Sequence, residues 1–85
     1  MTAADMTETI RSILIDHGRL SAEVTSLHDE SDLFQAGLSS HASVNLMLAL
    51  EEHFAVEFPE RMLQRRSFSS IASIRSCLSE LVATT

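Results

Sequence analysis

Two consecutive serines, Ser39 and Ser40, follow a Gly-Leu pair and open a stretch whose apolar residues recur at helical spacing. The first backbone N–H groups of a helix have no partner within it, and the helix dipole is positive at that end. A phosphodiester attached to a serine there is electrostatically favoured. Serine is also a preferred N-cap residue, so capping alone would explain either hydroxyl. Two serines permit both roles, with Ser39 as the cap and Ser40 free for modification.

Other side chains that could do chemistry do not form a recognisable set. The chain has four histidines, which are His17, His28, His41 and His53. None pairs with another at i, i+3 or i+4, so the sequence predicts no metal site. His41 follows Ser40 directly, but neighbouring helical residues point about 100° apart and do not make a catalytic dyad. His41 therefore either contacts a phosphate or a partner, or is exposed without a role, and we expect no catalytic residues.

Three arginines form a local basic cluster, at Arg61, Arg65 and Arg66. One interpretation is a solvated face partly paired with Glu57 and Glu60, as for most surface ion pairs. The other is a contact for the phosphate or for an acidic surface on a partner. The sequence leaves both open.

Composition limits the classes of protein that fit. Twelve acidic residues stand against six arginines and no lysine, giving a net charge of −6 that argues against nucleic-acid binding. The single cysteine, Cys77, excludes an internal disulfide, and we expect a packed or half-exposed thiol. No apolar run approaches the roughly 18 residues of a membrane span, and no signal peptide is recognisable, so we expect a cytoplasmic protein.

The spacing of apolar residues predicts an all-α fold. A first helix should run from about Ala3 to His17, capped by Thr2 or Asp5 and stopped at Gly18. The sequence from Arg19 to Ser39 reads as a long loop. Leu33, Phe34 and Leu38 are expected to pin it onto the helices.

The rest of the chain predicts a second helix from about Ser40 to Phe54, a short third helix from Pro59 to about Leu63, and a fourth that Ser69 or Ser70 caps. The chain thus forms a single domain, 1–85, with a small four-helix bundle of three main helices and one short helix. We expect its core to contain Ile10, Leu14, Leu46, Met47, Leu50, Phe54, Ile74, Leu78 and Leu81.

Three segments together resemble a known family. Residues 32–40 read Asp-Leu-Phe-Gln-Ala-Gly-Leu-Ser-Ser, residues 49–54 read Ala-Leu-Glu-Glu-His-Phe, and residues 56–59 read Val-Glu-Phe-Pro. Their order and spacing resemble the acyl carrier protein family, which reads Leu-Gly-x-Asp-Ser-Leu, then a helix ending Leu-Glu-x-x-Phe, then Ile-Pro. The resemblance extends from about Ile10 to Leu81. Counting back along the helix places the family's modified serine at Ser40.

The sequence departs from that family around the serine. The usual Asp before it is Ser39, the usual Leu after it is His41, and Ser43 and Asn45 stand where acids are common. These departures put the family's acidic mode of docking in doubt. The pattern looks more like a stand-alone bacterial branch, some of whose members receive amino acids from truncated, synthetase-like ligases.

A face of the second helix offers another mode of docking. Residues four apart share a helix face, so Val44 and Leu48 stack with Ser40, away from the predicted core stripe. We expect both to be at least partly exposed. Partners are expected to dock through Val44, Leu48, Ser39 and His41, with charge secondary.

The resemblance implies a definite role for the protein. A phosphopantetheinyl transferase, with Mg²⁺ and coenzyme A, would attach 4′-phosphopantetheine covalently to Ser40. The arm would carry an acyl or aminoacyl group as a thioester, taken from a loading ligase and passed to a downstream acceptor enzyme. The chain itself would be a monomer and not an enzyme. The alternative is a non-catalytic helical interaction module in which Ser40 is only an N-cap.

Overall fold

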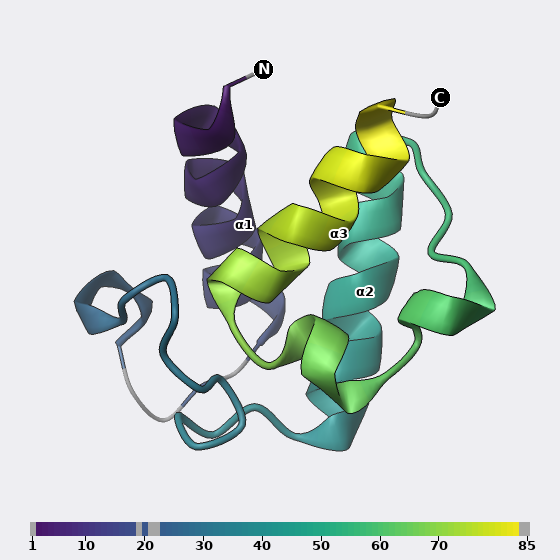
Figure 1. Cartoon of the computed structure of the whole chain (residues 1–85). Helices are drawn as coiled ribbons and strands as arrows, with labels where there is room; N and C mark the ends of the chain where they lie inside the picture. Colours follow the sequence, from purple (N-terminus) through teal and green to yellow (C-terminus); the bar gives the residue numbers. More distant parts are fainter. Residues whose placement is uncertain (1, 19, 21–22, 84–85) are drawn as a thin grey trace.

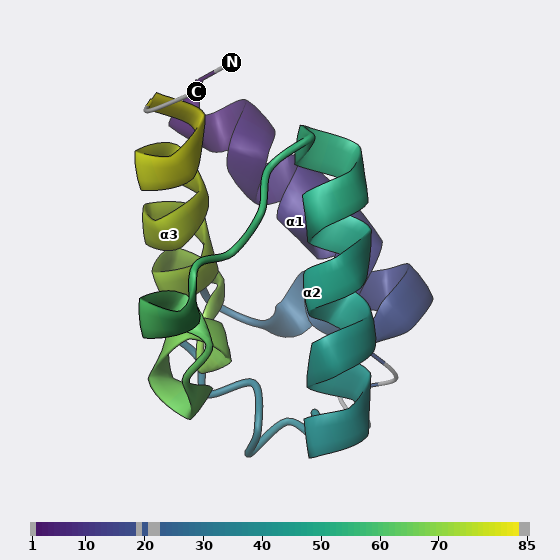
Figure 2. The same ribbon diagram turned by 90° about the vertical axis from the view of Figure 1, so that its right-hand side faces the viewer.

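Three α-helices account for most of the chain that the structure describes. The structure is a computed structural model, and it describes residues 2–18, 20 and 23–83. Its elements are α1 (Ala3–His17), η1 (Val24–Ser26), α2 (Ser40–Phe54), η2 (Glu60–Met62), η3 (Arg65–Phe68) and α3 (Ile71–Ala83), where η marks a 3₁₀ turn. The start of α1 and the end of α3 lie at one end of the bundle, and the start of α2 lies at the other (Figures 1 and 2).

Local signals set the bounds of α1. The Thr2 hydroxyl accepts a hydrogen bond from the Asp5 N–H at 3.1 Å, and the Asp5 carboxylate accepts from the Thr2 N–H, which makes a capping box. The predicted caps are therefore both used. Gly18 ends the helix, donating from its N–H to the Leu14 carbonyl. A Cβ at Gly18 would lie 2.8 Å from that carbonyl oxygen, so close approach requires glycine there.

The second helix begins and ends at the predicted residues. Its C-cap is Ala55, whose φ of 54° is left-handed and costs roughly 1–2 kcal/mol for a residue with a Cβ. Glu51 holds this turn: its backbone carbonyl accepts from Val56, and its carboxylate accepts from the Phe58 N–H at 2.8 Å. These bonds direct the chain back along the bundle toward α3 (Figure 2).

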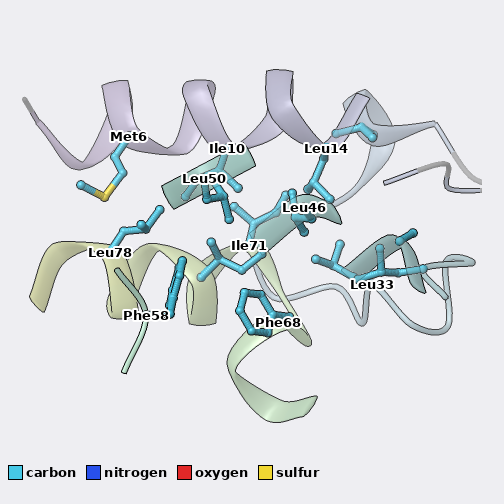
Figure 3. Close-up of a cluster of buried hydrophobic side chains, with 14 of the residues drawn as sticks. Met6, Ile10, Leu14, Leu33, Leu46, Leu50, Phe58, Phe68, Ile71 and Leu78 are labelled. Carbon is cyan, nitrogen blue, oxygen red and sulfur yellow. The ribbon is translucent and has the colours of Figure 1, made fainter. Parts of the chain in front are cut away.

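The core lies where α1 packs against both α2 and α3, with side chains from the connecting segments between them (Figure 3). Eight side chains are almost completely buried, namely Ile10, Leu14, Leu33, Leu46, Leu50, Ile71, Ile74 and Leu78. Six of the nine predicted core residues are among them. Met47, Phe54 and Leu81 are only partly buried and pack around this centre. Phe58 and Phe68 lie outside the α-helices and complete the core, with ring centroids 5.4 Å apart.

The short third helix predicted from Pro59 to about Leu63 is present in a shorter form, as the 3₁₀ turn η2 (Glu60–Met62). Pro59 lies outside a single 3₁₀ turn, and at Leu63 the backbone leaves helical geometry. A second 3₁₀ turn, η3, follows that the sequence did not predict. The reason is that buried anchors, such as Met62, hold this segment, while segments this short cannot stabilise an α-helix alone.

The long loop is fixed by a polar cluster as well as by apolar anchors. Leu33 and Leu38 are buried and Phe34 is partly buried, as predicted. Asp29 accepts hydrogen bonds from Arg11 at 2.9 Å and Arg75 at 3.1 Å, so it joins the loop to α1 and α3.

This cluster also lowers one pKa. Arg11 is partly buried against the loop, where it donates to the Val24 carbonyl as well. Hydrogen bonds from Arg11 and Arg75 hold the pKa of Asp29 below its ordinary value. No helix among the described residues has the length and apolar character to cross a membrane.

Candidate functional site

The two serines at the start of α2 have different environments. Ser39 is the N-cap, and its hydroxyl accepts from the Ala42 N–H at 3.0 Å. Ser40 is the first helical residue and is exposed. Its carbonyl accepts from the Ser43 hydroxyl at 2.7 Å, but its own hydroxyl has no hydrogen bond to any described residue. The predicted division of roles between cap and free hydroxyl therefore holds in the geometry.

Ser40 lies on the wall of a pocket of about 290 Å³. The described residues that line it are Phe34, Ser40, Ser43, Val44, Met47, Leu63, Gln64, Arg65 and Phe68. None of them is acidic, and Arg65 is the one with a charge. The sequence singled out Ser40 and Val44 but predicted no pocket, and it gave no functional role to Leu63, Gln64 or Phe68. The arginine cluster is the sequence feature that could have pointed to this pocket, because Arg65 lines it.

The three arginines of that cluster do not act together. Arg65 lies over the Phe34 ring, with its guanidinium carbon 3.9 Å from the ring centroid. Arg61 donates to Glu80 at 2.8 Å, and not to Glu57 or Glu60, the acids that one interpretation of the sequence paired with the cluster. Arg66 lines a separate cavity together with Cys77, whose thiol is half-buried as expected.

The apolar face beside Ser40 is exposed, as the helical spacing predicts. Val44 is 51% exposed and Leu48 is 52% exposed. Leu63, on the other side of the pocket, is 50% exposed. Ser39 and His41 are exposed as well, so the four predicted docking residues are all accessible.

A second, larger groove of about 680 Å³ lies between α1 and α2. It brings Asp16 and His17 of α1 together with Glu52 and His53 of α2, two pairs that are far apart in the sequence. Among the described residues, no group of three or more side chains has a geometry suited to a metal ion.

The fold and the exposed hydroxyl at the start of α2 define a small helical carrier domain. The chain belongs to the family described as "Phosphopantetheine attachment site", which matches residues 7–78. It is a carrier protein, and 4′-phosphopantetheine is its covalently attached cofactor. The resemblance to acyl carrier proteins is thereby confirmed.

Individual relatives agree with this assignment. The chain is 54% identical over 69 residues to a protein of Agrobacterium fabrum named aminoacyl carrier protein, covering 81% of this chain and 83% of that protein. It is similar to the carrier protein of Agrobacterium tumefaciens bound to an engineered Bradyrhizobium japonicum glycine:carrier protein ligase with ATP, with 49% identity and a TM-score of 0.86 over 89% of this chain and 99% of that one. A glycylated carrier protein complexed with the Bradyrhizobium ligase, at 24% identity and a TM-score of 0.65 over 88% of this chain and 96% of the matched chain, shares the fold.

Proposed function

We propose that Ser40 is the attachment point of the phosphopantetheine arm. The observation that carries this proposal is the free, exposed Ser40 hydroxyl beside a serine already used as the cap. Ser40 Oγ would be the nucleophile toward phosphorus in the coenzyme A pyrophosphate. Its proton would pass to the transferase as the new O–P bond forms and adenosine 3′,5′-diphosphate leaves. The resulting diester anion would lie at the positive end of α2.

The cargo proposed for this arm is an amino acid. The attached group supplies a terminal thiol, on which an aminoacyl group is held as a thioester. Support comes from the relative named aminoacyl carrier protein and from the carrier proteins bound to glycine:carrier protein ligases. In this proposal the chain supplies no acid, base or nucleophile after the arm is attached, and so acts as a substrate and shuttle, not an enzyme. A ligase loads it and an acceptor enzyme unloads it.

The proposed docking surface consists of Val44 and Leu48, with Ser39 and His41 at its edge. Val44 and Leu48 are half exposed on the face of α2 that also presents Ser40. Exposed apolar side chains beside a functional group suit a partner that buries them on contact. No acidic residue lies in the first turn of α2, so electrostatic attraction at this end is weak.

The attachment point is tested by mass spectrometry on matched variants. Incubated with coenzyme A, Mg²⁺ and a broad-range transferase, the wild-type chain should gain one phosphopantetheine, and Ser40→Ala should gain none. Ser39→Ala should still be modified, while losing roughly 0.5–2 kcal/mol of unfolding free energy with the cap. Modification of the Ser40→Ala variant, or localisation of the group to Ser39 after digestion, would exclude Ser40.

The cargo is tested on the modified protein with ATP. We expect a glycine:carrier protein ligase to load a labelled amino acid that hydroxylamine releases, as a thioester requires. Unmodified protein and Ser40→Ala are the controls. Loading by a fatty acyl ligase but not by the amino acid ligase would overturn the aminoacyl assignment and leave the carrier role intact.

A further inference from the structure

The pocket beside Ser40 is built from three separate segments. Ser40, Ser43, Val44 and Met47 come from the first half of α2 and form one wall. The rest of the lining comes from Leu63, Gln64, Arg65 and Phe68, and from Phe34 of the long loop. A group attached to Ser40 therefore starts on the wall of the pocket and reaches its interior without crossing another part of the surface.

The position of Arg65 suits it to bind an anion at the pocket beside Ser40. Its guanidinium carbon lies over the Phe34 ring, 3.9 Å from the ring centroid, so a cation–π contact holds the group beside the pocket. Stacking uses the face of a guanidinium and leaves the N–H donors at its edge available. No carboxylate among the described residues pairs with Arg65, whereas Arg11, Arg61 and Arg75 all bind acidic side chains.

The chemistry of the pocket matches one occupant. Arg65 is the charged residue in a lining without acids, although the whole chain has twelve acidic residues and a net charge of −6. Most of the remaining lining is apolar. Such a pocket suits a segment in which one negative charge is followed by an apolar group. The phosphodiester of the arm followed by its dimethyl-substituted carbon has this chemistry.

We propose that Arg65, held on Phe34, binds the phosphodiester of the arm on Ser40 and turns the first part of the arm into this pocket. The proposal rests on Ser40 being the attachment point. The volume of about 290 Å³ is at the lower limit of the roughly 300–1,000 Å³ of ligand pockets. The pocket thus holds the first part of the arm and leaves the thiol end, with its cargo, outside for partner enzymes.

The test compares NMR spectra of each protein before and after the arm is attached. On conversion of the wild type, the Arg65 Nε–Hε signal and the methyl signals of Val44 and Leu63 should shift. In Arg65→Gln the Val44 and Leu63 shifts should be largely lost, and in the control Arg66→Gln they should persist. Arg65→Lys should restore part of the effect, because it keeps the charge but loses the planar fork.

The spectrum of each modified variant is compared with the spectrum of the same variant before modification. This comparison removes any effect of the substitution on the fold. Phe34→Leu is a second test of the proposal. It removes the ring under Arg65 and should therefore weaken the Val44 and Leu63 shifts. Shifts confined to residues 39–42 in the wild type, or unchanged in Arg65→Gln, would overturn the role of Arg65 while leaving Ser40 as the attachment point. If intact mass shows no added group in any protein, the attachment proposal fails and this inference fails with it.

Discussion

Two faces of α2 both carry large apolar residues but differ in environment. Leu46 and Leu50 are completely buried against α1 and the connecting segments, whereas Val44 and Leu48 are about half exposed. The exposed pair lies on the face that presents Ser40. Burial, not residue type, therefore distinguishes the side chains that hold the fold together from those available to partners.

The largest effect expected from this contrast is on stability. Leu50→Ala should lower the free energy of unfolding by roughly 2–5 kcal/mol, because it leaves a cavity in a core that is small to begin with. Leu48→Ala is the matched control and should change it by less than about 0.5 kcal/mol, as expected of an exposed site. Denaturant unfolding measures both. Equal losses for the two leucines would contradict the assignment of the faces.

Substitutions on the exposed face should instead affect loading of the amino acid. Val44→Asp and Leu48→Asp should reduce aminoacylation of the modified protein about tenfold each, since losing one apolar contact of about 1.5 kcal/mol corresponds to that factor. Their unfolding free energies should change little. Loading of the wild type should persist at moderate salt, because apolar docking is only weakly screened. Normal loading of both variants, together with salt-sensitive loading of the wild type, would rule out the apolar surface.

The smallest effect concerns the loop that leads into α2. Bonds from Arg11 and Arg75 lower the pKa of Asp29 in the folded state, so its carboxylate stabilises the fold above its ordinary pKa of 3.8. That contribution is lost as pH falls through the lowered value. Since Asp29 is about one-third exposed, each ion pair should be worth less than about 1 kcal/mol.

Acid titration of stability checks this expectation. The free energy of unfolding of Asp29→Asn should be lower than that of the wild type at neutral pH and should fall less steeply below about pH 4. Modification of Ser40 should be unaffected, because the Ser39 cap and the core contacts of α2 remain. An unchanged acid profile in the variant would show that Asp29 does not couple the loop to the helices.

Local signals in the sequence were enough to predict the bounds of the two longest helices. Thr2 with Asp5, Gly18 and Ser39 are capping signals within a few residues of the helix ends that they mark, so the bounds of α1 and α2 agree with prediction. Helical spacing likewise predicted the exposed face with Val44 and Leu48. In the segment after α2, the short helix predicted from Pro59 is a single 3₁₀ turn, and the second turn, η3, was not predicted.

Only the tertiary structure could decide which distant residues meet. Arg61 reaches Glu80 and Arg75 reaches Asp29, rather than acids nearby in sequence. Arg65 meets Phe34 across the pocket beside Ser40, although the sequence treated the three arginines as one cluster. The sequence by itself determined the bounds of α1 and α2, their N-caps and the free serine, because these depend on contacts within a turn or two. The pocket around that serine depends on how three segments pack, and no local pattern encodes that packing.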